Sequence, residues 1–303
     1  PLGGSTIISH VIDTAQKVSH EITLVTGYKK EILKNYVTNL YSSINAVDQD
    51  EQLGTGHAVK QAAHLITADQ KVLILYGDVP LISEATIQAL LTKSDECCLL
   101  SMEPEDPTPY GKIIKNNQGD AIKITEQKDA SDEERKIKEV FTGIMVVKGS
   151  LLIESLEKID NNNAASEYYL TDLVEILSSK GVRINCIQAN PKEVVGANNK
   201  HELHELEAIL RTMKSEQLLD QGITLMDVNR VDLRGHVKAG KDCSIDVNVI
   251  LEGNIILGEN VTIKSNVVLQ DVSIGDNSVI EAFSHLSSAI VGANCNIGPY
   301  ARL

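Results

Sequence analysis

Two short segments hold the residues best suited to chemistry in this chain. Residues 49–58 form a loop that begins with the side-chain amides of Gln49 and Gln52 and continues into a run with two glycines. Residues 72–81 are an apolar run that leads into the carboxylate of Asp78. In an open α/β sheet, such loops and strand ends face the crevice where ligands bind. The two segments together predict a nucleotide site.

The loop offers groups that suit a base and a ribose. Because a side-chain amide both donates and accepts hydrogen bonds, Gln49 and Gln52 match the imide edge of uracil. The backbone of Gly54 and Thr55 adds further donors. A Gly-Thr-Gly loop taken alone is equally compatible with a plain turn. We expect the following His57 to cap or pack locally, and a catalytic role is the alternative.

The strand before Asp78 places a carboxylate at the carboxyl edge of the predicted sheet. Mg²⁺ binds one or two protein carboxylates and completes its shell with water and phosphate oxygens, which makes Asp78 a candidate ligand. Gly77 lets a ligand approach the backbone closely because it has no Cβ. The alternative is a solvated aspartate in a turn.

The charge and composition of the chain restrict its partners. The formal net charge is −14, which argues against a nucleic-acid-binding surface. An anionic substrate then needs a metal ion or a local cluster of donors. No apolar run approaches the roughly 20 residues that span a bilayer, and no signal-like segment opens the chain. We therefore expect a cytoplasmic protein that binds neither nucleic acid nor membrane.

The cysteines are odd in number, scattered, and mostly set in apolar, strand-like runs. None has the spacing of zinc ligands. We therefore expect them to be reduced core residues. They are Cys97, Cys98, Cys186, Cys243 and Cys295.

Strand-like and helical runs alternate as far as about residue 195, which predicts an α/β fold with a mainly parallel sheet. We expect strands at residues 22–26, 72–76, 97–102, 140–147 and 182–188, and helices at residues 84–93 and 169–180. Ser83 is the expected N-cap of the first helix. Residues 199–219 predict a charged helix with one apolar stripe, which connects two domains or docks on the first one.

A six-residue period takes over after residue 236. Its apolar anchors are Ile245, Leu251, Leu257, Ile263, Leu269, Ile274, Ile280, Leu286, Val291 and Ile297. Each hexapeptide supplies one short strand and a turn, so three of them make one coil of a parallel β-helix with the anchors inside. Two steps, from Leu269 to Ile274 and from Leu286 to Val291, are shorter by one residue. The alternative is an ordinary antiparallel domain. Because a solenoid needs an end cap, we expect the coils to continue beyond Leu303.

From end to end, the order of these and further motifs resembles the bacterial bifunctional N-acetylglucosamine-1-phosphate uridylyltransferases and glucosamine-1-phosphate acetyltransferases. Each motif is weak alone, and their order is specific. The motifs are Gln49-x-x-Gln52-Leu-Gly-Thr-Gly-His-Ala58, Leu75-Tyr-Gly-Asp-Val-Pro-Leu81, Asp106-Pro-Thr-x-Tyr-Gly111, Glu126-x-Lys-Asp129, Thr142-Gly143, Asn161-Asn-Asn-Ala164, Glu167-Tyr-Tyr-x-Thr-Asp172 and Gly196-x-Asn-Asn199.

The resemblance implies where the substrates bind. It places Gln49, Gln52 and the backbone of Gly54 and Thr55 at the uridine. Along the sugar-phosphate side it places Tyr76, Gly77, Gly111, Glu126, Tyr169 and Thr171. It assigns Asp78 and Asn198 to a magnesium ion, with Asp78 as the catalytic residue.

The resemblance also implies the domains and the reaction. It predicts a Rossmann-like uridylyltransferase domain at residues 1–199, a linker helix at residues 200–221 and the start of a left-handed β-helix acetyltransferase domain at residues 222–303. The implied reaction joins UTP and N-acetylglucosamine 1-phosphate, with Mg²⁺, to give UDP-N-acetylglucosamine and pyrophosphate. Acetyl-CoA would serve a second reaction, on glucosamine 1-phosphate. A homotrimer is implied because β-helices of this family associate in threes.

Three departures separate the chain from the family pattern. The family's first strand and phosphate-binding loop come before the segment that begins at Pro1, so we expect the stated chain alone to be inactive. Phe141 stands where the family has an asparagine, and a phenyl ring cannot make the hydrogen bonds of an amide to the sugar. The family's acetyltransferase residues lie on coils beyond Leu303.

Two other functions stay open on this sequence. One is a related sugar-phosphate nucleotidylyltransferase that uses another base or hexose. The other is a catalytically silent trimeric scaffold, in which Phe141 marks a decayed site and the β-helix serves only assembly.

Overall fold

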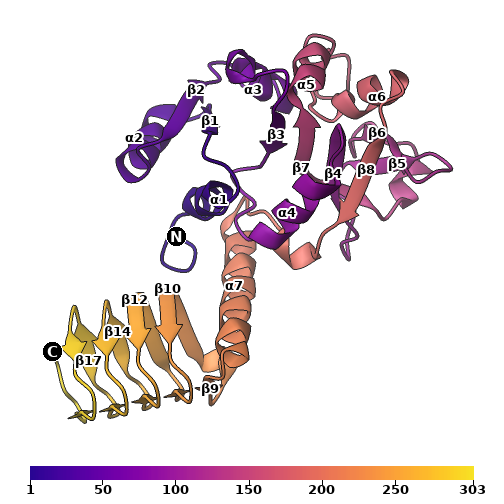
Figure 1. The fold of residues 1–303 in the computed structure, drawn as a ribbon. Helices are drawn as coiled ribbons and strands as arrows, with labels where there is room; N and C mark the ends of the chain where they lie inside the picture. The colour runs from indigo at the N-terminus through magenta and orange to yellow at the C-terminus, as the bar shows by residue number, and fades with distance from the viewer. The chain divides into compact units, whose positions relative to one another are not determined.

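The computed structural model describes residues 1–303, which divide into two compact units (Figure 1). The α/β unit comprises Ile8–Val195 and holds every predicted site residue except Asn198. The coil unit comprises Pro1–Ile7 together with Gly196–Leu303. No helix in the chain is both long enough and apolar enough to cross a membrane.

Helices and strands alternate through the α/β unit, as the sequence predicts. Its helices are α1 (Ile7–Gln16, whose first residue belongs to the coil unit), α2 (Lys30–Leu40), α3 (Thr55–Gln61), α4 (Glu84–Lys93), α5 (Gly149–Leu156) and α6 (Asp172–Ser179), with single 3₁₀ turns at Ala63–Leu65, Glu134–Lys136 and Pro191–Glu193. Its strands are β1 (Ile22–Thr26), β2 (Ile44–Asp48), β3 (Lys71–Ile74), β4 (Cys97–Met102), β5 (Lys112–Lys115), β6 (Ala121–Thr125), β7 (Val140–Lys148) and β8 (Ile184–Gln188).

These strands form two sheets. β1 and β2 pair in parallel, and the larger sheet has the order β6-β5-β7-β4-β8, with β3 also paired to β7. β3, β4 and β5 are antiparallel to β7, whereas β4 and β8 are parallel. The predicted common direction therefore holds for β3, β4 and β8, which β5 also follows, whereas β6 and β7 run against them. A parallel connection usually needs a crossover helix, and since no α-helix lies between β4 and β7, the chain returns antiparallel.

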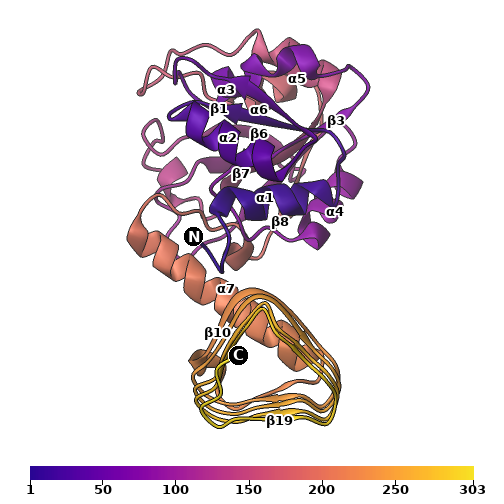
Figure 2. The same ribbon diagram turned by 90° about the vertical axis from the view of Figure 1, so that its left-hand side faces the viewer.

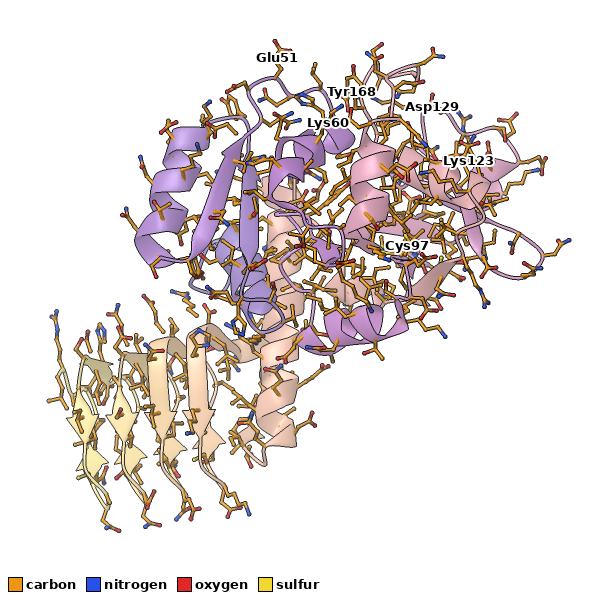
Figure 3. The ribbon with its side chains drawn as sticks, turned by 45° about the horizontal axis from the view of Figure 1, so that its top comes forward. Glu51, Lys60, Cys97, Lys123, Asp129 and Tyr168 are labelled. Atoms are coloured by element: carbon orange, nitrogen blue, oxygen red, sulfur yellow. The ribbon has the colours of Figure 1, made fainter.

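The larger sheet is covered on both faces. Residues of β4 alternate between two apolar clusters, with Cys97 and Leu99 in the cluster that contains α5 and α6, and Cys98 and Leu100 in the cluster that contains α4. This alternation is the period of a strand buried on both sides. Cys97 lies among the core side chains (Figure 3). All five cysteines are free thiols, as predicted.

Local contacts explain where the elements begin and end. Ser83 caps α4 as predicted, since its Oγ accepts a hydrogen bond from the Thr86 backbone N–H at 3.1 Å. β3 ends two residues earlier than predicted because residues 76–79 form a turn, in which Val79 N donates to Tyr76 O at 3.3 Å. β8 begins at Ile184 because Val182 N still donates to Leu177 O at 3.1 Å, which closes the end of α6.

The coil unit begins with one long helix and continues as short strands. The helix is α7 (Lys200–Asp220), and a 3₁₀ turn follows at Val228–Arg230. The strands are β9 (Thr224–Leu225), β10 (Val231–Ala239), β11 (Ser244–Ile245), β12 (Val249–Leu257), β13 (Thr262–Ile263), β14 (Val268–Gln270), β15 (Ser273–Ile274), β16 (Val279–Ile280), β17 (His285–Ser287), β18 (Ile290–Val291) and β19 (Asn296–Ile297). Figure 2 shows them as the sides of a three-sided coil.

Every strand pair in the coil unit is parallel, which excludes the antiparallel alternative. Early pairs lie 18 residues apart, as Val231 and Val249 do, and later pairs lie 17 apart, as Ser273 and Ile290 do. The change follows from the five-residue steps in the sequence. Nine of the predicted anchors are buried inside, and Ile297 is partly buried against the same cluster.

Candidate active site

The loop before α3 is joined to residues 168–170. Gly54 has φ +112°, and a Cβ on it would lie 2.6 Å from Tyr168 O, so only glycine fits there. Tyr168 N donates to Leu53 O at 2.8 Å, and Gly56 N donates to Tyr168 O at 2.8 Å. Thr55 Oγ1 accepts from the backbone N–H of Leu170 at 3.0 Å. These bonds bring the predicted uridine-binding loop, residues 49–58, beside Tyr169 and Thr171. These two residues lie more than a hundred positions from the loop in the sequence.

A second contact joins Thr171 to the β5–β6 hairpin. Thr171 Oγ1 donates to Glu126 Oε1 at 3.0 Å. Gly111 lies beside this carboxylate, since a Cβ on Gly111 would be 2.9 Å from Ile124 Cγ2 and 3.4 Å from Glu126 Oε2. Burial raises the pKa of Glu126, and the Thr171 hydrogen bond opposes this rise. Gly111, Glu126 and Thr171 therefore form one cluster around a half-buried carboxylate.

Tyr76 connects this cluster to the end of β3. The pKa of the Tyr76 phenol is raised to about 12, mainly by burial and also by the charges of Glu126 and Asp78, while a hydrogen bond with Thr55 opposes the rise. Tyr76 is thus within electrostatic reach of both carboxylates. Its ring packs on Gly143, which has φ +86° and on which a Cβ would lie 2.6 Å from Tyr76 Cε2. Both the close approach and the backbone conformation at this position require glycine.

Gln49 is the most enclosed of the predicted uridine residues, with 8% of its surface exposed. Its Nε2 lies 3.0 Å from Gly54 O and 3.1 Å from His57 Nδ1. Gln52 folds back on the same loop, where its Nε2 donates to Gln49 O at 3.1 Å. His57 therefore packs locally, as expected, and its partner is a predicted site residue.

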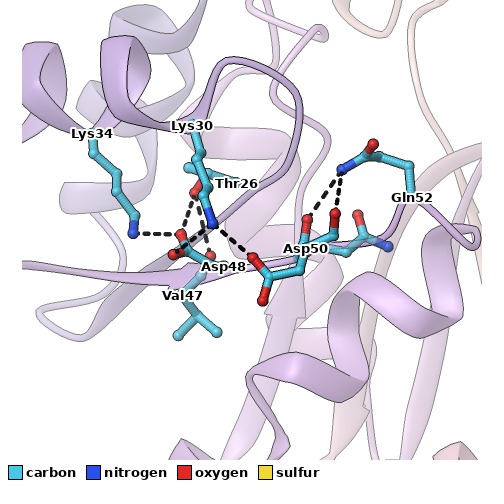
Figure 4. A network of polar contacts seen from close by, with 8 residues as sticks. Thr26, Lys30, Lys34, Val47, Asp48, Asp50 and Gln52 are labelled. Carbon is cyan, nitrogen blue, oxygen red and sulfur yellow. Dashed lines mark hydrogen bonds and ion pairs between the residues drawn. The ribbon is translucent and has the colours of Figure 1, made fainter.

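Two aspartates on either side of Gln49 are held by lysines of α2 (Figure 4). Lys30 Nζ lies 3.3 Å from Asp48 Oδ2 and 2.6 Å from Asp50 Oδ1, and Lys34 also pairs with Asp48. Lys34 is the main cause of the lowered pKa of Asp48, and Lys30 adds to it. Exposed pairs of this kind contribute little to stability, and they link α2 to the residues on both sides of Gln49.

The predicted magnesium ligands belong to different units. Asp78 lies in the α/β unit, in the turn that follows β3, and Gly77 before it is exposed. Asn198 lies in the coil unit, just before the N-cap of α7, where its backbone N donates to Glu202 Oε2 at 2.6 Å. One carboxylate and one amide oxygen are hard donors of the kind that Mg²⁺ accepts. No cluster of three or more histidine, cysteine or acidic side chains forms a metal site by itself.

Phe141 is a core residue. It lies on β7, is 5% exposed, and packs in the cluster that contains Leu99, Ile124 and Met145. Its backbone N donates to Gly111 O at 2.9 Å, so it is adjacent to the Glu126 cluster. The side chain offers this cluster no polar group.

Sequence reasoning missed two contributors to the site. Lys112 is fully buried, and its Nζ donates to Tyr110 O at 2.9 Å and to Pro107 O, which fixes the loop before Gly111. Tyr168 acts through its backbone, and backbone hydrogen bonds leave no signature in residue types. The motif that ends at Gly111 lies next to Lys112, and Tyr168 stands inside the motif Glu167-Tyr-Tyr-x-Thr-Asp172, but neither motif predicts these contacts.

Comparisons with known proteins identify the fold and the family of the chain. Residues 1–138 match the family model of the MobA-like NTP transferase domain, and residues 231–303 match that of the GMPPB C-terminal domain. A crystal structure titled as UDP-glucose pyrophosphorylase complexed with UDP-glucose shares the fold, with a TM-score of 0.54, 17% identity, and coverage of 69% of this chain and 88% of that one.

A curated relative covers the whole chain. The "Bifunctional protein GlmU" of Cellvibrio japonicus (strain Ueda107) is 43% identical over 307 residues, which are 100% of this chain and 67% of that protein. An identity of this size, over two matched domain types, is far beyond what a shared fold alone produces. The chain belongs to the GlmU family.

Proposed function

We propose that the protein containing this chain transfers UMP from UTP to N-acetylglucosamine 1-phosphate, which yields UDP-N-acetylglucosamine and pyrophosphate. The observation that carries this proposal is the convergence of Gln49, Gly54, Thr55, Tyr76, Gly111, Glu126 and Thr171 in one region of the α/β unit. Membership of the nucleotidyltransferase family supports the reaction type. The base, the sugar and the second activity are proposals.

In this proposal the uridine loop reads the base. The Gln49 amide and the backbone of Gly54 and Thr55 bind the uracil and its ribose. Gln52 stabilises the loop. The sugar lies over the cluster of Gly111, Glu126 and Thr171, with Tyr169 and the Tyr76–Gly77 turn beside it. A carboxylate in this position accepts hydrogen bonds from sugar hydroxyls. The absence of a Cβ at Gly111 lets the Ile124 and Glu126 side chains pack closely against the chain, which places the carboxylate beside this residue.

The reaction needs positioning more than covalent chemistry. A phosphate oxygen of the sugar attacks the α-phosphorus of UTP, a P–O bond to that oxygen forms, and the bond to pyrophosphate breaks. Catalysis of phosphoryl transfer consists largely of alignment and of neutralising the charge that develops. Asp78 and Asn198 are the residues proposed to hold Mg²⁺, which neutralises phosphate charge when bound. The other residues of the site bind and orient the two substrates.

The coil unit is proposed to be a left-handed parallel β-helix that belongs to an acetyltransferase domain. Its parallel pairing at offsets of 17 and 18 residues supports a solenoid of three-sided coils. The relative named above is bifunctional, and we propose that the complete protein also acetylates glucosamine 1-phosphate with acetyl-CoA and assembles as a homotrimer. A cytoplasmic location remains a prediction of the sequence.

One experiment tests the main reaction. The full gene product that contains this chain is incubated with UTP, N-acetylglucosamine 1-phosphate and Mg²⁺, and pyrophosphate release is measured. Release that depends on both substrates supports the proposal. No release at any magnesium concentration contradicts it and favours the silent trimeric scaffold.

A second candidate function is favoured by Phe141. Because this buried phenyl ring replaces an amide next to the Glu126 cluster, a related enzyme that uses another hexose 1-phosphate is the alternative. Replacing the sugar and the nucleotide in turn, in the same assay, separates the two. A Phe141→Asn variant that gains affinity for N-acetylglucosamine 1-phosphate would show that this position selects the sugar.

A further inference from the structure

Lys112 is a buried lysine on the sugar side of the proposed site. It lies on β5 and is fully buried, although lysine is rarely fully buried unless its charge has partners. Its Nζ donates to the backbone oxygens of Pro107 and Tyr110, the latter at 2.9 Å. Pro107 O also accepts from Tyr110 N at 3.2 Å, so the side chain of Lys112 holds both ends of a turn. This turn, residues 107–110, leads directly into Gly111.

The pairing of the strands places Lys112 next to the Glu126 cluster. β5 pairs with β6 so that Lys112 lies opposite Thr125, the residue before Glu126. On β7, Phe141 N donates to Gly111 O at 2.9 Å. The backbone at Gly111 is therefore held both by β7 and by the turn that Lys112 holds.

The charge of Lys112 also acts on the carboxylate of this cluster. Burial raises the pKa of Glu126, and the charge of Lys112 is among the interactions that oppose this rise. Burial lowers the pKa of Lys112, and the charges of Asp106 and Glu126 oppose that change. The two carbonyl oxygens that face Nζ favour its charged form as well. The ammonium and the carboxylate therefore each favour the ionised form of the other.

These contacts concern the sugar and not the nucleotide. An ionised carboxylate accepts hydrogen bonds through both oxygens, which suits the hydroxyl groups of a sugar. The hydrogen bonds of Lys112 end in the turn before Gly111 and do not reach residues 49–58. We infer that Lys112 is a positioning residue that orders this turn beside the Glu126 carboxylate, and so sets the affinity for the sugar phosphate and not for UTP. The inference rests on the proposed binding of the sugar at the Glu126 cluster.

The test measures KM for N-acetylglucosamine 1-phosphate, KM for UTP and kcat on the full gene product and its variants. Lys112→Met keeps an apolar side chain of similar length and removes the ammonium, whereas Lys112→Arg keeps a charge and can donate to two oxygens. Lys115→Met is the matched control, since it removes another lysine of β5, one that pairs with Glu139 at 2.6 Å. Thermal unfolding checks that each variant is folded.

Lys112→Met should raise KM for the sugar phosphate by about tenfold, the effect of losing one charge-assisted hydrogen bond. KM for UTP should stay close to the wild-type value. Lys112→Arg should recover most of the affinity for the sugar phosphate, and Lys115→Met should leave both KM values unchanged. If Lys112→Met is unfolded, Lys112→Gln, which is shorter and uncharged, provides the same comparison with Lys112→Arg.

Three results would overturn the inference. The first is an unchanged KM for the sugar phosphate in Lys112→Met. The second is an equal rise of both KM values, which would show a merely structural role, and the third is an arginine variant that binds the sugar phosphate no better than the methionine variant. A wild type that releases no pyrophosphate from UTP and N-acetylglucosamine 1-phosphate would instead contradict the proposed function. The failure of the inference and the failure of the proposed function can therefore be told apart.

Discussion

Thr55 and Leu170 are joined by one hydrogen bond across 115 positions of the chain, whereas Ile250 and Val268 of the coil unit pair across 18. The α/β unit brings its site residues together through such distant contacts, and a single loop depends on several of them. In the coil unit each strand depends only on its neighbours one coil away. A destabilising substitution should therefore have a local effect in the coil unit. In the α/β unit its effect should extend to other residues of the site.

The largest expected effect tests the coil unit. Leu269 is fully buried on β14, between Leu251 and Leu286 of the adjacent coils. Leu269→Ala should lower the free energy of unfolding of this unit by about 2–5 kcal/mol. Chemical denaturation and hydrogen exchange measure this loss. Ile290→Ala, at a position 89% exposed, is the control and should leave stability unchanged. Exchange that also increases around Gln49 would show that the units are not independent.

The next effect concerns activity in the α/β unit. Asp78→Asn keeps the shape of the side chain and removes its charge, so nucleotidyl transfer should slow by about 100-fold or more while the unfolding midpoint stays nearly constant. Steady-state pyrophosphate release measures the rate. Asp120→Asn, which removes a carboxylate paired with Arg183 at 2.7 Å, is the control and should leave the rate unchanged. Equal rates for wild type and Asp78→Asn would remove Asp78 from the mechanism.

A pair of glycines sharpens the role of close packing. Gly143 and Gly119 have almost the same φ, +86° and +85°, but only Gly143 has Tyr76 against it. Gly119→Ala should lower the free energy of unfolding by about 1–2 kcal/mol, because strain of the left-handed backbone conformation is the only cost of this alanine. Gly143→Ala should cost more and should also lower activity, because Tyr76 has to move. Denaturation midpoints and rates of both variants measure the difference. Equal losses of stability with unchanged activity would show that the ring contact does not matter.

The smallest effect concerns pH. Burial, with Asp160, Glu175 and Glu126 adding, raises the pKa of Asp172 to about 6. The folded state then binds a proton more tightly than the unfolded state, so this group lowers stability as pH rises from about 4 to about 6, and the loss persists above that. Asp172→Asn should therefore stabilise the protein by about 1 kcal/mol at pH 7 and by nothing below pH 4. Urea denaturation at both pH values checks this, and a variant less stable at pH 7 would contradict it.

The same contrast explains how much of the molecule the sequence predicts. The anchors from Ile245 to Ile297 could be predicted because the same short apolar pattern recurs many times along the chain. The cap at Ser83 could be predicted because it depends on residues three positions apart. The reversed direction of β7 could not, since strand direction depends on connections and not on residue types.

The candidate site is predicted less evenly. The order of the motifs identified residues such as Gln49 and Glu126. It did not predict the contacts that bring these residues together. The Tyr168 backbone and the Gln49–His57 pair depend on distant or atom-level geometry. The adjacency of Phe141 to the Glu126 cluster is similar, because a lone aromatic residue in an apolar strand indicates only a core position in the sequence.

The parallel offsets of the coil unit have a consequence for how it can vary in length. Coils of 18 and of 17 residues both keep their inward side chains paired, as Leu233 with Leu251 and Ile274 with Val291 show, so a one-residue change between two strands is tolerated. Adding or deleting a full circuit of the chain leaves every remaining pair intact, because each new layer meets a surface like the one it replaces. A single gene duplication can thus lengthen this part of the molecule in whole steps, and outward-facing positions stay aligned in columns along its sides.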